Sequence, residues 1–173
     1  MPALDGLKVV KSSIHGYGLV ALRPFQAGDI IVYGDGVLYS EDDDFDDTYS
    51  LLLNFPEEDE DGNLEPQLLF DLTDQTRWIN HSCEPNAEVD TSWEPKTSTA
   101  RCWWIALRDI AAGEELTYDY AFSAEVSEPC ACGSDKCRGV IIDEHEIDQV
   151  PARYRHLVRP RYRKRLDKAR RGA

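Results

Sequence analysis

The chain has no long hydrophobic run. Its first 13 residues carry no apolar stretch of signal-peptide length, and no later segment of the 173 residues approaches the roughly 18 consecutive apolar residues that a membrane-spanning helix needs. We therefore expect a soluble intracellular protein, cytoplasmic unless its basic C-terminus acts as a nuclear import signal. With 42% hydrophobic residues, the chain is long enough for one compact domain with a core and a tail.

A regular alternation of strands and helices is also missing, as is any internal repeat of solenoid period, so we do not expect a parallel α/β sheet. Instead, the sequence has short stretches rich in Val, Ile, Leu and aromatic residues, separated by turns rich in Gly, Pro and Asp. These predicted strands are residues 7–10, 18–22, 30–33, 68–72, 87–89 and 101–107. The pattern indicates a mostly β fold with short helices.

Basic residues are scarce in the first 150 positions, which hold nine Lys and Arg against 32 Asp and Glu, whereas residues 151–173 hold ten Lys and Arg against one Asp. An acidic body repels nucleic acid and membrane surfaces and attracts basic polypeptides. The same charge also suits a protein that is merely soluble and acidic, so composition alone leaves both interpretations open.

Two acidic runs stand out in that body. Residues 41–47 hold six carboxylates and residues 57–61 hold five. They are either solvated loops or a rim that receives a basic peptide. Residues 48–55, which lie between them, predict a short helix or strand packed on the core.

The basic C-terminal segment, residues 151–173, has Leu157, Tyr162 and Leu166 as sparse apolar anchors. Pro160 predicts a break between two short helical pieces. The segment could bind nucleic acid or another anionic partner, or fold back on the acidic body.

Cysteine is absent before Cys83, and three of the five cysteines form a C-x-C-x4-C cluster. In an intracellular chain a metal explains clustered thiols better than disulfides do, although free thiols are the alternative. Structural zinc prefers four ligands. Cys102 lies in an apolar run typical of core packing, whereas Cys83 lies in a polar turn. The predicted zinc ligands are therefore Cys83, Cys130, Cys132 and Cys137.

Four motifs follow one another along the chain: a G-x-G turn at residues 16–18, RWINHSCEPN at 77–86, ALRDIAAGEELTYDY at 106–120 and C-x-C-x4-C-R-G at 130–139. In this order they resemble the SET-domain family of protein-lysine methyltransferases over residues 7–141. The resemblance implies a fold of small curved sheets with a pseudoknot and a post-SET zinc cluster that includes Cys83. Because no cysteine precedes Cys83, a pre-SET region is not expected. We expect a small stand-alone enzyme with a SET domain (1–123), a zinc-binding segment (124–142) and a basic tail (143–173).

The resemblance also assigns roles to individual residues. It implies that S-adenosylmethionine lies against the turn that carries the G-x-G motif and beside an Asn-His pair, with an aromatic residue nearby. Tyr120 matches the tyrosine at the base of the lysine channel, and Tyr118 matches a position that influences how many methyl groups are added. The implied cofactor-binding residues are His15, Gly16, Tyr17, Tyr49, Asn80 and His81.

Each of these residues also has a purely structural interpretation. A buried Asn-His pair could satisfy backbone groups of its neighbours, and the two tyrosines could be core aromatics. Alternation along an extended segment puts Tyr118 and Tyr120 on one side, so that both hydroxyls can face one cavity. Two departures from the family pattern are Trp78, where Phe or Leu is frequent, and the segment 33–36, which matches only part of a Tyr-x-Gly-Glu motif.

The leading hypothesis is an S-adenosylmethionine-dependent protein-lysine methyltransferase that adds one or two methyl groups to a basic, histone-like or ribosomal, protein. The alternative is a zinc-stabilised interaction module without turnover, whose basic tail binds nucleic acid or a protein partner. A third hypothesis places the tail in the acidic groove, with Lys164 or Lys168 as a pseudosubstrate or automethylation site.

Overall fold

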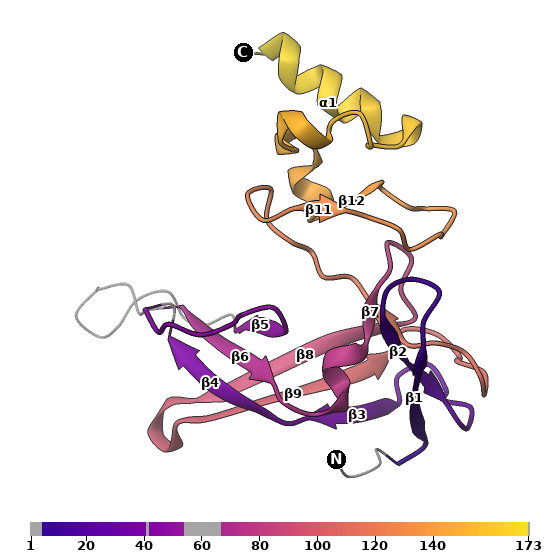
Figure 1. The fold of residues 1–173 in the computed structure, drawn as a ribbon, viewed down its shortest axis with the longest axis vertical. Coiled ribbons are helices and arrows are strands. Elements are labelled where there is room, and N and C mark those ends of the chain that lie inside the picture. Colours follow the sequence, from indigo (N-terminus) through magenta and orange to yellow (C-terminus); the bar gives the residue numbers. More distant parts are fainter. Residues whose placement is uncertain (1–4, 41, 54–66, 173) are drawn as a thin grey trace.

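The computed structural model describes residues 5–40, 42–53 and 67–172, apart from the side chains of Pro95 and of residues 167–172. Within this part the chain is mostly β, as the sequence predicts (Figure 1). The strands are β1 (Leu7–Lys11), β2 (Tyr17–Ala21), β3 (Ile30–Gly34), β4 (Gly36–Ser40), β5 (Ser50–Leu53), β6 (Leu68–Leu72), β7 (Asn80–His81), β8 (Ala87–Glu94), β9 (Thr99–Ala106), β10 (Thr117–Tyr118), β11 (Glu128–Pro129) and β12 (Val140–Ile141). The helical segments are four 3₁₀ turns, η1 (Gln75–Trp78), η2 (Pro95–Thr97), η3 (Glu144–Gln149) and η4 (Ala152–Tyr154), and the α-helix α1 (Pro160–Gly172).

Two three-stranded antiparallel sheets form the larger part of the molecule. In the first, β8 and β9 make a long hairpin and β3 pairs with the other edge of β9, with a bulge between Ile30 and Val32. Burial alternates along β8 and β9, as the two-residue period of a strand requires. The second sheet has the order β4-β6-β5, which leaves β5 on an edge.

These two sheets, the antiparallel pair β1-β2 and the connecting segments around Phe25 and Ile110 enclose one core. Its fully buried members come from elements far apart in the sequence and include Leu19, Phe25, Trp104, Ile110 and Leu116. Burial of side chains of this size contributes roughly 1.5–3 kcal/mol each to folding. The core therefore supports the short elements that carry the motifs.

A parallel pair, β7 with β10, brings two of these motifs together. The backbone N–H of Ser82 donates to the carbonyl of Tyr118 at 3.0 Å, and the N–H of Thr117 donates to Asn86 Oδ1 at 2.9 Å. Asn86 Nδ2 in turn donates to the carbonyl of Glu115 at 2.8 Å. The NHSCEPN string and the EELTYDY string are thus held side by side over their whole lengths.

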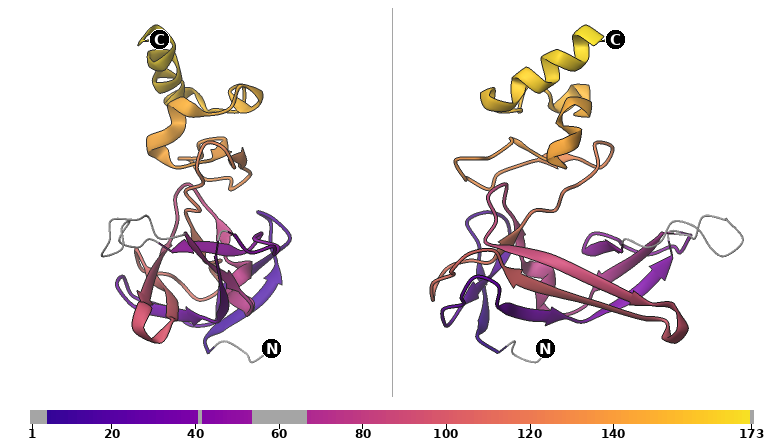
Figure 2. Two further views of the ribbon diagram at one scale, coloured as in Figure 1. Left: turned by 90° about the vertical axis from the view of Figure 1, so that its left-hand side faces the viewer. Right: turned by 180° about the vertical axis from the view of Figure 1, so that it is seen from behind.

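The C-terminal residues form a second, smaller core above the sheets (Figures 1 and 2). Ile142, Ile147, Val150 and Val158 are buried there to within 1% exposure, with Leu166 of α1 packed against them. Leu157 and Tyr162 are partly buried against the same cluster. The three apolar anchors predicted for the basic tail therefore do fix it, and Pro160 begins α1 as expected.

The predicted strands all correspond to observed ones, and residues 50–53 settle the helix-or-strand alternative as strand β5. The main omissions are β4, which follows a Gly-Asp-Gly turn, and the outer half of β8, whose exposed positions carry polar residues. The acidic run at residues 57–61 lies outside the described residues. In the described part of the chain no helix is long and apolar enough to cross a membrane.

Candidate active site and metal centre

Asn80 joins the NHSC string to the G-x-G turn. Its Nδ2 lies 3.2 Å from the carbonyl oxygen of His15, 2.8 Å from that of Tyr17 and 2.9 Å from Glu115 Oε1. Asn80 is 7% exposed, so these contacts replace water for a buried amide. The predicted turn and the predicted Asn are therefore neighbours, with His15 contributing its backbone while its side chain is exposed.

Glu115 is a residue of this site that the sequence reasoning did not single out. Besides Asn80, it accepts a hydrogen bond from Ser12 Oγ at 2.8 Å. A Cβ atom on Gly18 would lie 2.2 Å from Glu115 Oε1, so any other residue there would displace the Glu115 carboxylate. The sequence could have indicated Glu115 as a candidate site residue, because it belongs to the GEELTYDY string, and Gly18, next to it in the structure, ends the G-x-G turn.

An aromatic wall stands beside the turn. The ring centroid of Trp78 lies 5.5 Å from that of Tyr17 and 5.4 Å from that of Tyr49. The guanidinium of Arg77 lies over the Tyr49 ring, 4.1 Å from its centroid. Trp78, which departs from the family pattern, thus connects two predicted cofactor-binding residues.

Tyr118 and Tyr120 lie with their ring centroids 4.7 Å apart, on one side of their segment as alternation predicts. Burial, followed by the negative charge that Tyr49 would carry, raises the pKa of Tyr120 to about 12. Burial likewise raises the pKa of Tyr118 well above its usual value. The Tyr120 hydroxyl donates to the carbonyl of Ile79 at 3.0 Å. Both side chains are therefore neutral phenols at physiological pH.

His81 lies between the tyrosines and the cysteines. The backbone N–H of Tyr120 donates to His81 Nδ1 at 3.2 Å, and His81 Nε2 lies 3.3 Å from Cys83 Sγ. Asp119 Oδ1 lies 3.5 Å from the same Nδ1. His81 therefore connects the Tyr120 backbone and Asp119 to the Cys83 sulfur.

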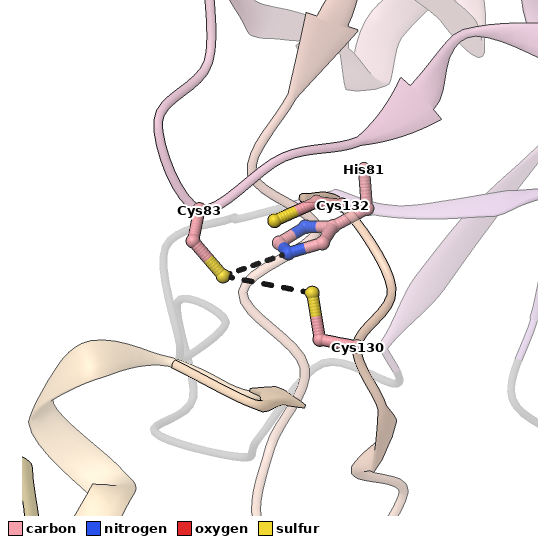
Figure 3. A group of neighbouring side chains, drawn as sticks. All are labelled: His81, Cys83, Cys130 and Cys132. Carbon is pink, nitrogen blue, oxygen red and sulfur yellow. Dashed lines mark hydrogen bonds between the residues drawn. The ribbon is translucent and has the colours of Figure 1, made fainter. Parts of the chain in front are cut away.

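Four potential metal ligands converge at this point: the ligand atoms of His81, Cys83, Cys130 and Cys132 all lie within 4.8 Å of one another (Figure 3). The Cys83 and Cys130 sulfurs are 3.7 Å apart. A disulfide would require about 2.0 Å. Two thiolates bound to one zinc at about 2.3 Å in a tetrahedron lie about 3.8 Å apart. The cysteine geometry therefore fits zinc.

Cys137 lies outside this 4.8 Å set but is buried beside it. Burial raises the pKa of its thiol, and the next residue, Arg138, donates its backbone N–H to Cys83 Sγ at 3.3 Å. The structure thus brings three of the four predicted cysteines together with His81, and places Cys137 next to this set rather than in it.

Hydrogen bonds already favour thiolate at the centre of the cluster. The bond with Cys130, followed by those from His81 and the Arg138 N–H, lowers the pKa of Cys83 below its usual value, although burial opposes this. The Arg138 N–H donates to Cys83 Sγ at 3.3 Å, and the Gly139 N–H donates to Cys137 Sγ at the same distance. Such N–H donors around the sulfurs suit metal-bound thiolates.

Cys102 is separate from this cluster. It is 1% exposed in β9, and its sulfur lies 3.7 Å from the carbonyl oxygen of Gly34. Burial raises the pKa of its thiol to about 12. Cys102 is thus an inert core residue, as its apolar sequence context predicts.

The basic tail and the described acidic run lie far apart. In both Figures 1 and 2, α1 is at the end of the molecule opposite the sheet β4-β6-β5, beside which residues 42–47 lie. Arg165 pairs with Glu144 at 3.1 Å, and Arg163 Nε donates to the carbonyl of Val158 at 3.1 Å. The tail therefore does not fold over this part of the acidic body. Lys164 is exposed, and the side chain of Lys168 lies outside the described residues.

Comparison with known proteins agrees with this geometry. The SET domain family matches residues 16–121. The chain is 34% identical over 148 residues to the histone-lysine N-methyltransferase trithorax of Drosophila virilis, 34% identical over 150 residues to histone-lysine N-methyltransferase 2B of Homo sapiens, and 32% identical over 150 residues to the H3 lysine-4 specific histone-lysine N-methyltransferase of Yarrowia lipolytica. Each match covers 78% of this chain but only 4%, 5% and 12% of the respective relative. The chain belongs to the SET-domain family.

Proposed function

We propose that this protein is an S-adenosylmethionine-dependent protein-lysine methyltransferase. The observation that carries the proposal is the convergence of three motifs at one place: Asn80 holds the G-x-G turn, and its neighbour His81 holds the backbone of Tyr120. The names of the matched relatives, all histone-lysine N-methyltransferases, support the same activity.

The turn at residues 15–17, Asn80 and the aromatic wall would hold the cofactor, which supplies an electrophilic methyl group on a sulfonium. Three features suit such a ligand. A Cβ on Gly16 would meet no atom within 4 Å, so the turn faces open space. The Tyr17 side chain is 55% exposed and presents an aromatic surface. Arg77 Nε is buried and has no hydrogen-bond partner among the described residues, which leaves a donor for an acceptor group.

The two tyrosines would then orient the lysine amine. Because the Tyr120 hydroxyl donates its proton to Ile79, its oxygen lone pairs are left to face the reacting groups. Oxygen lone pairs stabilise the partial positive charge that moves between donor and amine during transfer. The raised pKa of both phenols keeps them uncharged and unable to serve as strong bases. Their burial also favours the neutral, nucleophilic form of the lysine.

Tyr118 supports a limit on the number of methyl groups. Its ring packs between Tyr120 at 4.7 Å and Trp104 at 6.0 Å, measured between centroids, so it has little freedom to move aside. We propose one or two methyl groups per lysine. A trimethylated product as the main species would contradict this limit.

The cysteine cluster would hold a structural zinc through Cys83, Cys130, Cys132 and Cys137. His81 would lie beside this site in contact with the Cys83 sulfur, and Cys137, which is buried next to the cluster, would complete a set of four sulfurs. With four protein ligands such a site has no open position, so its role is structural.

A basic protein is the substrate class that the charge of the chain supports. The described acidic residues 42–44, 46 and 47 are all exposed. The Thr48 N–H donates to Asp46 Oδ1 at 3.1 Å, and the next residue, Tyr49, belongs to the aromatic wall, so this loop leads directly into the wall. Exposed carboxylates near the site would attract a Lys- and Arg-rich polypeptide, and the attraction would weaken as salt increases.

The test is mass-spectrometric detection of methyl transfer to a panel of histones and ribosomal proteins, comparing the intact chain with Tyr120→Phe. Methyl groups that appear on lysine with the unmodified chain, and are reduced about 100-fold or more in the variant, would support the proposal. No transfer by a zinc-loaded, folded chain would contradict it and favour a non-catalytic interaction module.

A further inference from the structure

We infer that Arg138 and Asp119 form a positioning clamp that makes the placement of Tyr120 and His81 depend on the cysteine cluster. Arg138 follows Cys137 directly, and Asp119 lies between the two tyrosines. The inference deepens the proposed methyl-transfer function and takes the roles of His81 and Tyr120 from it.

The clamp is a bidentate ion pair. Arg138 Nη1 donates to Asp119 Oδ2 at 2.8 Å, and Nη2 donates to Oδ1 at 2.6 Å. The Arg138 side chain is 4% exposed and that of Asp119 is 31% exposed. A planar guanidinium facing a carboxylate in this way fixes orientation as well as distance. The pair therefore holds the two segments in one relative position.

Arg138 also contacts the cluster itself. Its backbone N–H donates to Cys83 Sγ at 3.3 Å, so one residue touches both the sulfurs and Asp119. A second path runs from Cys83 Sγ to His81 Nε2 at 3.3 Å and from His81 Nδ1 to the Tyr120 N–H at 3.2 Å. The two paths form a ring. Cys83 contacts Arg138 and His81, and these two residues contact the Asp119 carboxylate and the Tyr120 N–H respectively.

Alternation along the segment explains why a contact at Asp119 directs the tyrosines. Side chains at successive positions point to opposite sides, so Arg138 holds the segment from the side opposite the phenols. Rotation of the segment would move both rings away from the site. A buried ion pair commonly adds little net stability, so its main consequence here is geometric.

The matched control is the ion pair between Lys136 and Glu84. It starts from the same cysteine segment but joins it to the stretch after Cys83, with Lys136 Nζ 2.8 Å from Glu84 Oε1 and side chains that are 61% and 43% exposed. Exposed ion pairs of this kind contribute little to the stability of a protein. Lys136→Gln therefore removes a charge from the same loop without touching the clamp.

The experiment uses the full chain loaded with zinc and compares Asp119→Asn, Arg138→Gln, Arg138→Lys and Lys136→Gln. Asp119→Asn is the main variant, because it leaves the Arg138 N–H and every cysteine unchanged. Three quantities are measured: bound zinc per chain, amide hydrogen exchange at Tyr120 by NMR, and kcat and KM for methyl transfer to a basic peptide. The exchange measurement is repeated on the unmodified chain after zinc is removed with a chelator.

We expect Asp119→Asn to retain zinc, to accelerate exchange at Tyr120 by about tenfold, and to lower kcat by about 10- to 100-fold with KM changed less than about threefold. Arg138→Lys should restore part of the loss relative to an Arg138→Gln variant. Chelation should accelerate exchange at Tyr120 at least as much, whereas Lys136→Gln should change none of the three quantities.

Unchanged exchange at Tyr120 in Asp119→Asn, or an equal effect of Lys136→Gln, would overturn the clamp. If the unmodified chain transfers no methyl group to any substrate, the proposed function fails, while zinc content and amide exchange still decide whether the clamp exists. Loss of zinc in Asp119→Asn would also overturn it, because the residue would then be needed by the metal site itself.

Discussion

The β-rich part of the molecule and its C-terminal part are held together in different ways. Among the described residues, the core of the first contains 16 buried residues and long antiparallel ladders, whereas the core of the second contains seven buried residues and one two-residue ladder. The second part adds the cysteine cluster, the Arg138–Asp119 pair and hydrogen bonds from arginine side chains to backbone carbonyls. The first part is therefore stabilised mainly by apolar burial, and the second by a few specific contacts.

The candidate site lies where these two parts meet. The turn at residues 15–17, Asn80 and the tyrosines belong to the β-rich part, but His81 and Asp119 contact Cys83 and Arg138. Because the contacts are specific and few, loss of any one in the C-terminal part should have local consequences. Loss of a core residue in the β-rich part should affect the whole molecule.

Removal of the proposed zinc should give the largest effect. Structural zinc sites contribute about 10–16 kcal/mol at neutral pH. We expect amide exchange in residues 140–158 to accelerate by more than about 100-fold after chelation, while β8 and β9 keep their protection. Added zinc should reverse the change, and unaltered exchange in residues 140–158 would contradict the comparison.

Trp104→Ala should be the most destabilising single substitution in the β-rich part. The side chain is fully buried in the core, and truncation of such a residue costs about 3–5 kcal/mol in the free energy of unfolding. Urea denaturation measures this loss. Trp103→Ala, at the adjacent and only partly buried position, is the control and should cost less than half as much.

Gly139→Ala should destabilise the C-terminal part by about 2–3 kcal/mol. Gly139 has φ of 85°, and an added Cβ would lie 2.1 Å from the carbonyl oxygen of Leu157. Gly133→Ala is the matched control, since its φ is 72° but no atom lies within 4 Å of the added carbon. Gly133→Ala should lower the free energy of unfolding only by the cost of the left-handed backbone conformation, about 1 kcal/mol. Equal losses in thermal unfolding would show that the contact with Leu157 is unimportant.

Cys102 should make a smaller, pH-dependent contribution to the stability of the folded state. Its thiol has a pKa of about 12 when folded against a usual value of 9.0, so the folded state holds the proton more tightly. The resulting stability is present below pH 9 and is lost as the pH rises from about 9 to about 12. Between pH 9 and pH 10 the loss should be about 1 kcal/mol, and Cys102→Ala should not show it. Denaturation curves at both pH values measure the difference, which should be absent if ionisation of Cys102 is irrelevant.

Local patterns sufficed to predict much of this fold and site. Apolar alternation located the strands, and the fixed strings around Asn80 and Tyr120 identified two motifs that the structure brings together through β7 and β10. The apolar context of Cys102 and the polar context of Cys83 predicted their different environments correctly. In each case the informative residues are neighbours in sequence.

The remaining features depend on contacts between distant segments. Glu115 meets Asn80 and Ser12 across the site, and Asp119 meets Arg138 from the C-terminal cluster. Both carboxylates lie in the GEELTYDY string, but the string does not show which of the distant residues each one contacts. The sequence shows that Trp78 is unusual for the family, but it does not predict that the Trp78 ring lies between those of Tyr17 and Tyr49. The sequence also does not predict that His81 lies close to Cys130 and Cys132, because this depends on how the C-terminal segment folds back against the NHSC string.

The most direct measurement is calorimetric binding of S-adenosylmethionine to the zinc-loaded chain and to Asn80→Ala and Tyr120→Phe. If Asn80 holds the cofactor turn and Tyr120 acts on the bound groups, the unmodified chain should bind the cofactor. Tyr120→Phe should bind it within about threefold, and Asn80→Ala should lose about tenfold or more in affinity. Absence of binding by the unmodified chain, or affinity that is unchanged in Asn80→Ala, would contradict the proposed site.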